Sequence, residues 1–406
     1  MKARGSSSLP RTVRWTALGG LIGLSLLVIA GQGTTIGGRP SSSIGLSASG
    51  GEDSVRISFT PAPGASQSRI LWRRTDLTAP GTSIQSNAPA HLDRIDGGSA
   101  MNGTYAWTWN GSGVRMYFID SGINGSEAQL SGRIAPGFSL GPTAYDADPI
   151  PHGTEAAKLA AGTVAGVAKG ATVVSVSVYD DPGAEGGAGI GAATLEACVD
   201  FILADHASSG APAVVSASLE LAGMQEGGAD DPGVAAQIAR LLDAGIPLVI
   251  AAGDGDVDVD ARLADADPRI IWTSSSSTED ARVSDKPYGQ VVTVYAPWET
   301  TSGTAPQVSG VVAKILQANP ALGPTRIKEV IVSQSRPVVT DVPDGANLRL
   351  NADAQTSEWS TSPARSGSVE LGELATDATY EIAGQSMIEG VWSAQTAPVT
   401  VSTRAG

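Results

Sequence analysis

Five short apolar runs recur through the middle of the chain, and helix-length segments separate them. The runs carry little charge and are rich in β-branched residues, as strands buried on both faces of a sheet must be. Strands that alternate with helices predict a parallel α/β sheet, in which the chemistry gathers at the carboxyl ends of the strands. The runs span residues 114–120, 172–180, 213–218, 246–253 and 291–297.

Composition and charge narrow the class of protein. The chain has 406 residues, of which 41% are hydrophobic and 17% charged, and this predicts packed globular structure in two or three domains. A formal net charge of −15 argues against a nucleic-acid binder, which needs a basic face to meet phosphates. The one cysteine, Cys198, excludes an intramolecular disulfide, and its amphipathic surroundings predict a buried side chain.

The N-terminus has the pattern of an export signal. An uncharged apolar run at residues 17–30 is shorter than the roughly 20 residues of a membrane span and fits the core of a signal peptide. Residues 1–30 are therefore expected to be a cleaved signal peptide of a secreted protein without a stable membrane partner, and an uncleaved anchor is the alternative. Residues 31–43 are expected to be a linker. The basic residues that precede the run are Lys2, Arg4, Arg11 and Arg14.

Three side chains beside these runs have the chemistry of a hydrolase. Asp120 ends the first run, so its carboxylate is expected at the mouth of the sheet. His152 begins a helical stretch, where an imidazole can transfer protons near neutral pH. Ser302 precedes a helix whose N-terminal N–H groups and dipole suit a developing oxyanion. Each residue alone also has a structural explanation: a turn-capping aspartate, a surface histidine and an N-cap serine.

Together the three residues resemble the catalytic triad of the subtilisin-like serine proteases. The order Asp, His, Ser in an α/β chain is the subtilisin order, and the local sequences are similar to the family's boxes. The matching segments are Asp120-Ser-Gly-Ile-Asn, His152-Gly-Thr and Thr301-Ser-Gly-Thr-Ala-Pro-Gln-Val-Ser-Gly310. The segment from His91 to Val114 also resembles the mature N-terminus of the proteinase K branch.

The resemblance covers about residues 88–351 and implies both a fold and a reaction. The fold would be a three-layer α/β domain with a parallel sheet over residues 79–351. Ser302 would be the nucleophile and His152 its general base, while Asp120 would orient the imidazole. Such an endopeptidase hydrolyses peptide bonds in a protein or peptide substrate through an acyl-enzyme, with no metal or other cofactor in the chemistry. We expect a monomer.

Departures from the family pattern put this activity in question. Asp254 stands at the position of the oxyanion-hole asparagine, where an ionised carboxylate repels the oxyanion and a protonated one could donate to it. The serine box lacks its leading glycine and its methionine, and Thr300 and Gly303 stand there instead. Only four residues, 298–301, lead from Pro297 to Ser302, where the family has a longer stretch.

The expected substrate-binding segment departs as well. Ser218 and Leu219 match the start of the family's Ser-Leu-Gly-Gly sequence, but Glu220 and Leu221 replace its two glycines and bring bulk and charge to the cleft wall. Two interpretations therefore remain open. One is an active serine endopeptidase, and the other is a catalytically weak or inactive subtilase-fold protein that acts as an extracellular binding module.

The run Asp254-x-Asp256-x-Asp258-x-Asp260 has the spacing of a calcium loop without the glycine and glutamate of the helix–loop–helix site. A solvated acidic loop is the first interpretation of this run. A structural calcium ion is the alternative, because subtilases often bind one. We assign no residue as a metal ligand from the sequence.

The two ends of the chain resemble parts of one fibronectin type III module. Residues 352–403 resemble its second half, with a corner at Leu374-Ala-Thr-Asp-Ala-Thr-Tyr380 and a closing strand, and residues 44–78 resemble its first half. The expectation is a small all-β sandwich into which the protease domain is inserted, because domain termini often lie close together. A vestigial propeptide at the front and a separate half-size module at the back is the alternative.

Overall fold

The computed structural model describes residues 44–97, 100–180, 189–222, 231–354, 359–364, 367–388, 391–393 and 395–404. The expected signal peptide and linker lie outside these ranges. Among the helices of the described residues, none has the length and apolar character that a membrane crossing needs.

A nine-stranded sheet forms the centre of the larger domain. Its strands are β6 (Arg115–Asp120), β7 (Ile134–Ser139), β8 (Thr172–Ser177), β9 (Ala213–Ala217), β10 (Leu248–Ala251), β11 (Ile271–Ser276), β12 (Val294–Pro297), β13 (Arg336–Pro337) and β14 (Leu348–Arg349). Their order is β13-β14-β12-β11-β10-β9-β6-β8-β7, and all neighbours are parallel except β13 and β14. Each of the five apolar runs contains one of these strands.

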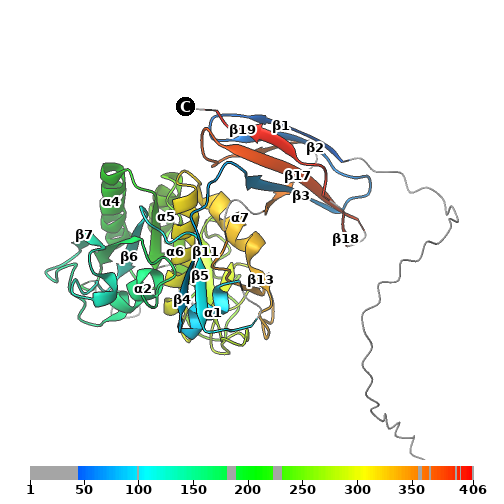
Figure 1. Cartoon of the computed structure of the whole chain (residues 1–406). Helices are drawn as coiled ribbons and strands as arrows, with labels where there is room; N and C mark the ends of the chain where they lie inside the picture. Colours follow the sequence, from blue (N-terminus) through cyan, green and yellow to red (C-terminus); the bar gives the residue numbers. More distant parts are fainter. Residues whose placement is uncertain are drawn as a thin grey trace, which may run out of the picture. The chain divides into compact units, whose positions relative to one another are not determined.

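Helices cover both faces of the sheet (Figure 1). Successive strand residues point to opposite faces, so Met116 and Phe118 of β6 pack in one core and Tyr117 and Ile119 in the other. The first core contains α2, α6 and α7, and the second contains α4 and α5, where Cys198 is buried as expected. This is the three-layer α/β fold that the resemblance implied. The helices are α2 (His152–Ala161), α4 (Ala192–Ser209), α5 (Pro232–Asp243), α6 (Thr301–Ala318) and α7 (Pro324–Gln334).

Shorter elements complete this domain. Strands β4 and β5 form an antiparallel pair, and the helix α1 between them buries His91, Leu92 and Ile95. Their bounds are β4 (Ser83–Ser86), α1 (Ala90–Ile95), β5 (Thr104–Trp107) and the short helix η1 (Ala128–Leu130).

The remaining strands form two antiparallel sheets. They are β1 (Gly45–Gly50), β2 (Val55–Thr60), β3 (Gln67–Arg74), β15 (Ser360–Ala364), β16 (Gly367–Leu371), β17 (Thr379–Ile388), β18 (Val391–Trp392) and β19 (Val399–Ser402). In the first sheet β2 lies between β1 and β16, and in the second β3 lies between β15 and β17. Strands from the front of the chain therefore pair with strands from its end (Figure 1).

Candidate active site

One cleft of about 290 Å³ brings the expected site residues together. It opens where β6, β9 and β10 end and where α2 and α6 begin, which is the edge at which a parallel sheet carries its chemistry. Its lining includes Asp120, His152, Ser218, Leu219, Glu220, Asp254 and Ser302.

Asp120 and His152 form a close pair at this edge. His152 Nδ1 lies 2.7 Å from Asp120 Oδ1, and the same oxygen accepts a hydrogen bond from the Ser121 N–H at 2.7 Å. The Asp120 side chain is only 3% exposed, whereas that of His152 is 41% exposed. The hydrogen bond to Asp120 raises the pKa of His152 above its usual value, although partial burial opposes the shift.

Asp148 stabilises the position of this pair through its own hydrogen bonds, and the sequence did not indicate this role. One of its oxygens accepts from Ser121 Oγ at 2.7 Å, and the other accepts from the Thr154 N–H at 2.8 Å. Ser121 Oγ in turn accepts from the Gly153 N–H at 2.9 Å. The carboxylate thus satisfies an N–H group in the first turn of α2, where a negative charge is favoured. These hydrogen bonds hold the backbone that follows His152 against the end of β6.

Gly153 shows how tightly α2 approaches β6. A Cβ at this position would overlap the Gly122 carbonyl oxygen and lie 3.0 Å from Asp120 Oδ1. A side chain after His152 would therefore push the start of the helix away from Asp120. The Gly in the His-Gly-Thr box is explained by this contact.

Ser302 is the second residue of α6 and faces the end of β9. Its Oγ donates to the Ser218 carbonyl oxygen at 3.3 Å, and Ser218 Oγ donates to the Ser302 carbonyl oxygen at 3.0 Å. Thr301 Oγ1 also donates to the Gly253 carbonyl oxygen at 2.7 Å, which joins the start of α6 to the residues after β10. The hydroxyl of Ser302 thus lines the same cleft as His152 while it is hydrogen-bonded to Ser218.

Asp254 has a cationic partner that the sequence did not indicate. Its Oδ1 lies 2.8 Å from Lys286 Nζ, and the Lys286 side chain is 9% exposed while that of Asp254 is 75% exposed. The hydrogen bond to Asp254 raises the pKa of Lys286, so the ammonium stays charged. A carboxylate paired in this way is an acceptor only. Asp254 therefore faces a cation at the position where the resemblance expects a hydrogen-bond donor.

The wall after β9 combines a buried and an exposed part. Ser218 is buried, and the carbonyl of Glu220 accepts from the Ile190 N–H at 3.1 Å, which fixes the backbone of this wall. The Glu220 side chain is exposed and makes no ion pair with any residue in the described ranges. The cleft wall therefore presents a free carboxylate.

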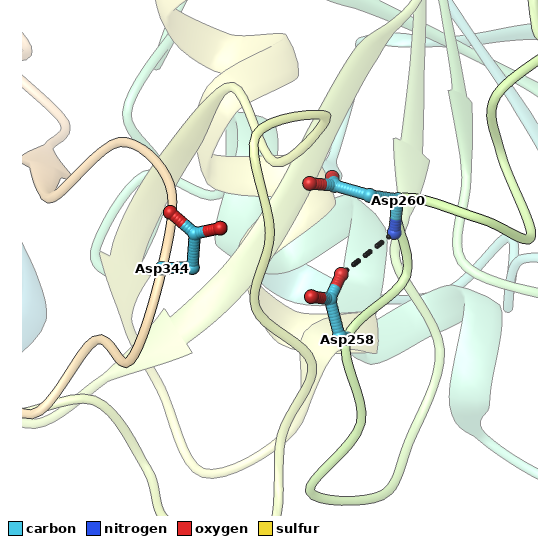
Figure 2. Close-up of side chains that lie close together, drawn as sticks. All are labelled: Asp258, Asp260 and Asp344. Atoms are coloured by element: carbon cyan, nitrogen blue, oxygen red, sulfur yellow. Dashed lines mark hydrogen bonds between the residues drawn. The ribbon is translucent and has the colours of Figure 1, made fainter.

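The acidic run from Asp254 is divided between two environments. Asp254 pairs with Lys286, and Asp256 Oδ1 lies 2.8 Å from Arg282 Nη2. Asp258 and Asp260 instead converge with Asp344, each offering an oxygen within 4.8 Å of the others (Figure 2). Carboxylate oxygens are the ligands that calcium prefers. A cation bound here would be held by Asp258, Asp260 and Asp344.

The parallel sheet, its two helix layers and the cleft define a subtilisin-like fold. Residues 273–357 match the subtilase family model. The chain resembles the crystal structure of a cold-adapted subtilisin-like serine proteinase with a TM-score of 0.56 and 27% identity, over 66% of this chain and 99% of that one. The chain is therefore similar to the subtilase family of serine proteases in fold and in part of its sequence.

Curated relatives have about 30% identity. Alkaline serine exoprotease A of Vibrio alginolyticus is 31% identical over 70% of this chain and 53% of its own length. An extracellular serine proteinase of a Thermus species is 29% identical over 67% of each chain. A cuticle-degrading protease of Metarhizium anisopliae is 29% identical over 65% of this chain and 70% of its own. The chain thus spans about half to two thirds of the length of these relatives.

Proposed function

We propose that this protein is a secreted serine endopeptidase with Asp120, His152 and Ser302 as its catalytic triad. The observation that carries the proposal is the 2.7 Å contact between Asp120 Oδ1 and His152 Nδ1, at the mouth of a cleft that Ser302 also lines. A buried carboxylate that holds Nδ1 leaves Nε2 available to take the serine proton.

In the proposed reaction Ser302 Oγ attacks the carbonyl carbon of the scissile bond and gives its proton to His152 Nε2. Asp120 stabilises the imidazolium, and the N–H of Ser302 at the start of α6 donates to the oxyanion. The C–N bond then breaks, the imidazolium gives its proton to the leaving amine, and the acyl group remains as an ester on Ser302. A water molecule repeats these steps, releases the acid and restores the serine.

The Ser302 hydroxyl must first leave the Ser218 carbonyl oxygen, which it contacts at 3.3 Å. A rotation about its Cα–Cβ bond redirects Oγ without moving α6. Catalytic hydrogen bonds are often long or misdirected before substrate binds. The present contact is consistent with that behaviour.

A catalytically weak or inactive binding protein is the second candidate function. The Asp254–Lys286 pair favours it, because an acceptor stands where the family has a donor to the oxyanion. Losing one such donor costs about 10²- to 10³-fold in rate. The two candidates share the fold and differ only in whether Ser302 reacts.

Reaction with a fluorophosphonate probe separates the two candidates. The endopeptidase should be labelled on Ser302, and Ser302→Ala should abolish labelling while the melting temperature stays unchanged. A Ser309→Ala variant, altered about two turns further along α6, should still react. A folded wild-type protein that stays unlabelled would sink the endopeptidase proposal and leave the binding module.

We also propose an extracellular monomer that acts on protein or peptide substrates, with a membrane-anchored form as the alternative. The name of the Thermus relative, an extracellular serine proteinase, supports an extracellular location. Finding the mature N-terminus after Ala30 in secreted protein, by N-terminal sequencing, would support cleavage. Protein retained in membranes with residues 1–30 intact would favour the anchor.

We propose further that residues 44–78 and 352–403 are the two parts of one fibronectin type III-like sandwich. The position of β3 between β15 and β17 supports this. Hydrogen exchange offers a test in the intact chain: backbone amides of β3 and β17 should open together. Exchange of β3 at a much lower free energy than β17 would contradict a single domain.

A structural calcium ion stays a prediction. Asp258, Asp260 and Asp344 are the residues at which to test it, because their oxygens converge. Calcium should raise the melting temperature of the wild-type protein over that in a chelator, and Asp344→Asn should remove the difference. An equal melting temperature in calcium and chelator would leave the run as a solvated acidic loop.

A further inference from the structure

Two departures of the serine box meet at Trp298. A Cβ on Gly303 would overlap Cδ1 and Nε1 of the Trp298 indole, so the indole occupies the space of the missing side chain after Ser302. Trp298 comes from the shortened segment before α6, and its backbone N–H donates to the Ser276 carbonyl oxygen at 3.0 Å. The shortened segment before α6 and the glycine at position 303 are therefore linked, because the Trp298 indole fills the space that a side chain at 303 would occupy.

A buried histidine holds the indole in this place. The rings of His91 and Trp298 meet edge to face, with centroids 5.2 Å apart and an interplanar angle of 88°. His91 Nε2 lies 2.9 Å from the Ala165 carbonyl oxygen, to which it donates, and the ring is only 6% exposed. Burial lowers the pKa of His91, so the ring beside the indole is uncharged at neutral pH. The aromatic neighbour of Trp298 therefore carries no charge at neutral pH.

Helix geometry tells on which side of Ser302 the indole lies. Gly303 and Gly310 are seven residues apart and share one face of α6. A Cβ on Gly310 would lie 3.0 Å from the Ala160 carbonyl oxygen of α2, so this face is turned toward α2. His152 begins α2, and His152 gives the proton to the leaving amine. Trp298 therefore lies on the side toward which the leaving group departs.

The indole remains available to a substrate. Trp298 is 38% exposed, and it does not line the cleft that contains Glu220 and Asp254. Among the residues that the structure describes, none accepts a hydrogen bond from its Nε1–H. A peptide that crosses Ser302 from that cleft would meet the exposed part of the indole next.

We infer that Trp298 binds the substrate residue immediately after the scissile bond and selects an apolar side chain there. This assignment rests on the proposed peptidase function and deepens it. The face of an indole buries apolar surface well. A hydrophobic contact of this size discriminates between substrates by about tenfold or more in kcat/KM.

The test compares substrates that share one acyl half. Peptides should carry Leu, Phe, Gly or Asp after the scissile bond, and a methyl ester should supply the same acyl half with a leaving group too small to contact the indole. The wild-type protein should prefer Leu and Phe by about tenfold over Gly and Asp. Trp298→Ala should remove that preference and leave ester hydrolysis within about twofold, and Trp298→Phe should keep part of it.

Two further variants sharpen the assignment. Gly303→Ala should displace the indole and weaken the preference, and in the Trp298→Ala background the same change should have little further effect. Trp392→Ala is the matched control, because this tryptophan of β18 stacks under Arg69 in the sandwich. It should leave the preference intact.

Three results would overturn the assignment. One is an active wild-type protein without any leaving-group preference, and another is an equal loss on peptides and ester in Trp298→Ala, which indicates a purely structural role. Both leave the proposed function standing. A wild-type protein that neither reacts with fluorophosphonate nor hydrolyses the ester overturns the proposed function, and this assignment with it.

Discussion

The carboxylates on the two sides of the cleft have different kinds of partner. On the side of β6 and α2, Asp120 and Asp148 accept hydrogen bonds from the groups that hold and orient His152. On the side of β10 and α6, Asp254 is bound by the buried ammonium of Lys286. Under the proposed function, the side of His152 is thus organised for proton transfer, whereas the side of Asp254 has an ion pair where a donor to the oxyanion is expected.

This contrast places any deficit in activity on one side of the site. A general base that is held and polarised can still activate Ser302, because proton transfer depends on the geometry of His152. Stabilisation of the oxyanion depends on donors aimed at the developing charge. We therefore expect slow turnover with a normally reactive serine.

Asp120→Asn is the change with the largest expected effect. An amide can no longer stabilise the imidazolium and favours the wrong tautomer of His152, so kcat should fall by about 10⁴-fold. Steady-state kinetics on the ester substrate measures this loss, and an unchanged melting temperature excludes unfolding. A fall of less than tenfold would show that Asp120 does not contribute to the chemistry. The contrast between the two sides of the cleft would then no longer hold.

Asp254→Asn should have the next largest effect, and in the opposite direction. It restores a donor to the oxyanion and removes a negative charge, so kcat should rise by up to about 10²- to 10³-fold. Asp256→Asn is the matched control, because it breaks the neighbouring pair with Arg282 without touching the cleft. No gain in Asp254→Asn would mean that Lys286 and the backbone already stabilise the oxyanion.

Asp148→Asn tests the support behind the base. The charge of Asp148 contributes to the raised pKa of His152, after the hydrogen bond to Asp120. His152 must be neutral to act as a base, so the acid limb of kcat/KM should lie above the ordinary histidine value of about 6.5 and should move to lower pH in this variant. The loss in kcat at its optimum should be about tenfold, below the ~10²–10⁴ of general base catalysis as a whole.

The control for this shift is Asp146→Asn, two residues away, because the raised pKa of His152 is caused by Asp120 and Asp148. Both pH profiles should be measured on the ester substrate. An acid limb that stays in place in Asp148→Asn would show that Asp148 acts on α2 alone and not on the imidazole.

The sequence predicted the parts of the site that are local in the chain. The apolar runs identify five strands of the main sheet, and the three boxes identify the residues that the cleft brings together. Lys286 and Trp298 could not be found in this way. Lys286 lies 32 residues from Asp254, and Trp298 meets a histidine from the other end of the domain.

The acidic run shows the same limit more sharply. Its regular spacing suggests one loop with one role, but tertiary contacts divide it. Arg282 and Lys286 neutralise its first half, and Asp344 adds a third carboxylate to its second half. Local spacing determines which residue types are near one another along the chain, while the fold determines which of them receive a counter-charge.

Glu220→Gln should have the smallest effect and tests whether Glu220 and Asp254, two exposed carboxylates that line the cleft, differ in effective charge. Lys286 neutralises Asp254, whereas Glu220 has no cationic partner among the described residues. Glu220 should therefore favour a basic side chain in the acyl half of the substrate. An exposed ion pair contributes at most about 1 kcal/mol, so the preference for Arg over Gln should fall by up to about fivefold in Glu220→Gln.

The preference should also weaken with added salt in the wild-type protein, because exposed charges are screened. Glu155→Gln is the matched control: its carboxylate already pairs with Lys158 on α2, 2.7 Å away, so its loss should leave the preference unchanged. If both variants lower the preference equally, the overall acidity of the protein attracts the substrate. If only Glu220→Gln lowers it, the unpaired carboxylate on the cleft wall makes the selection.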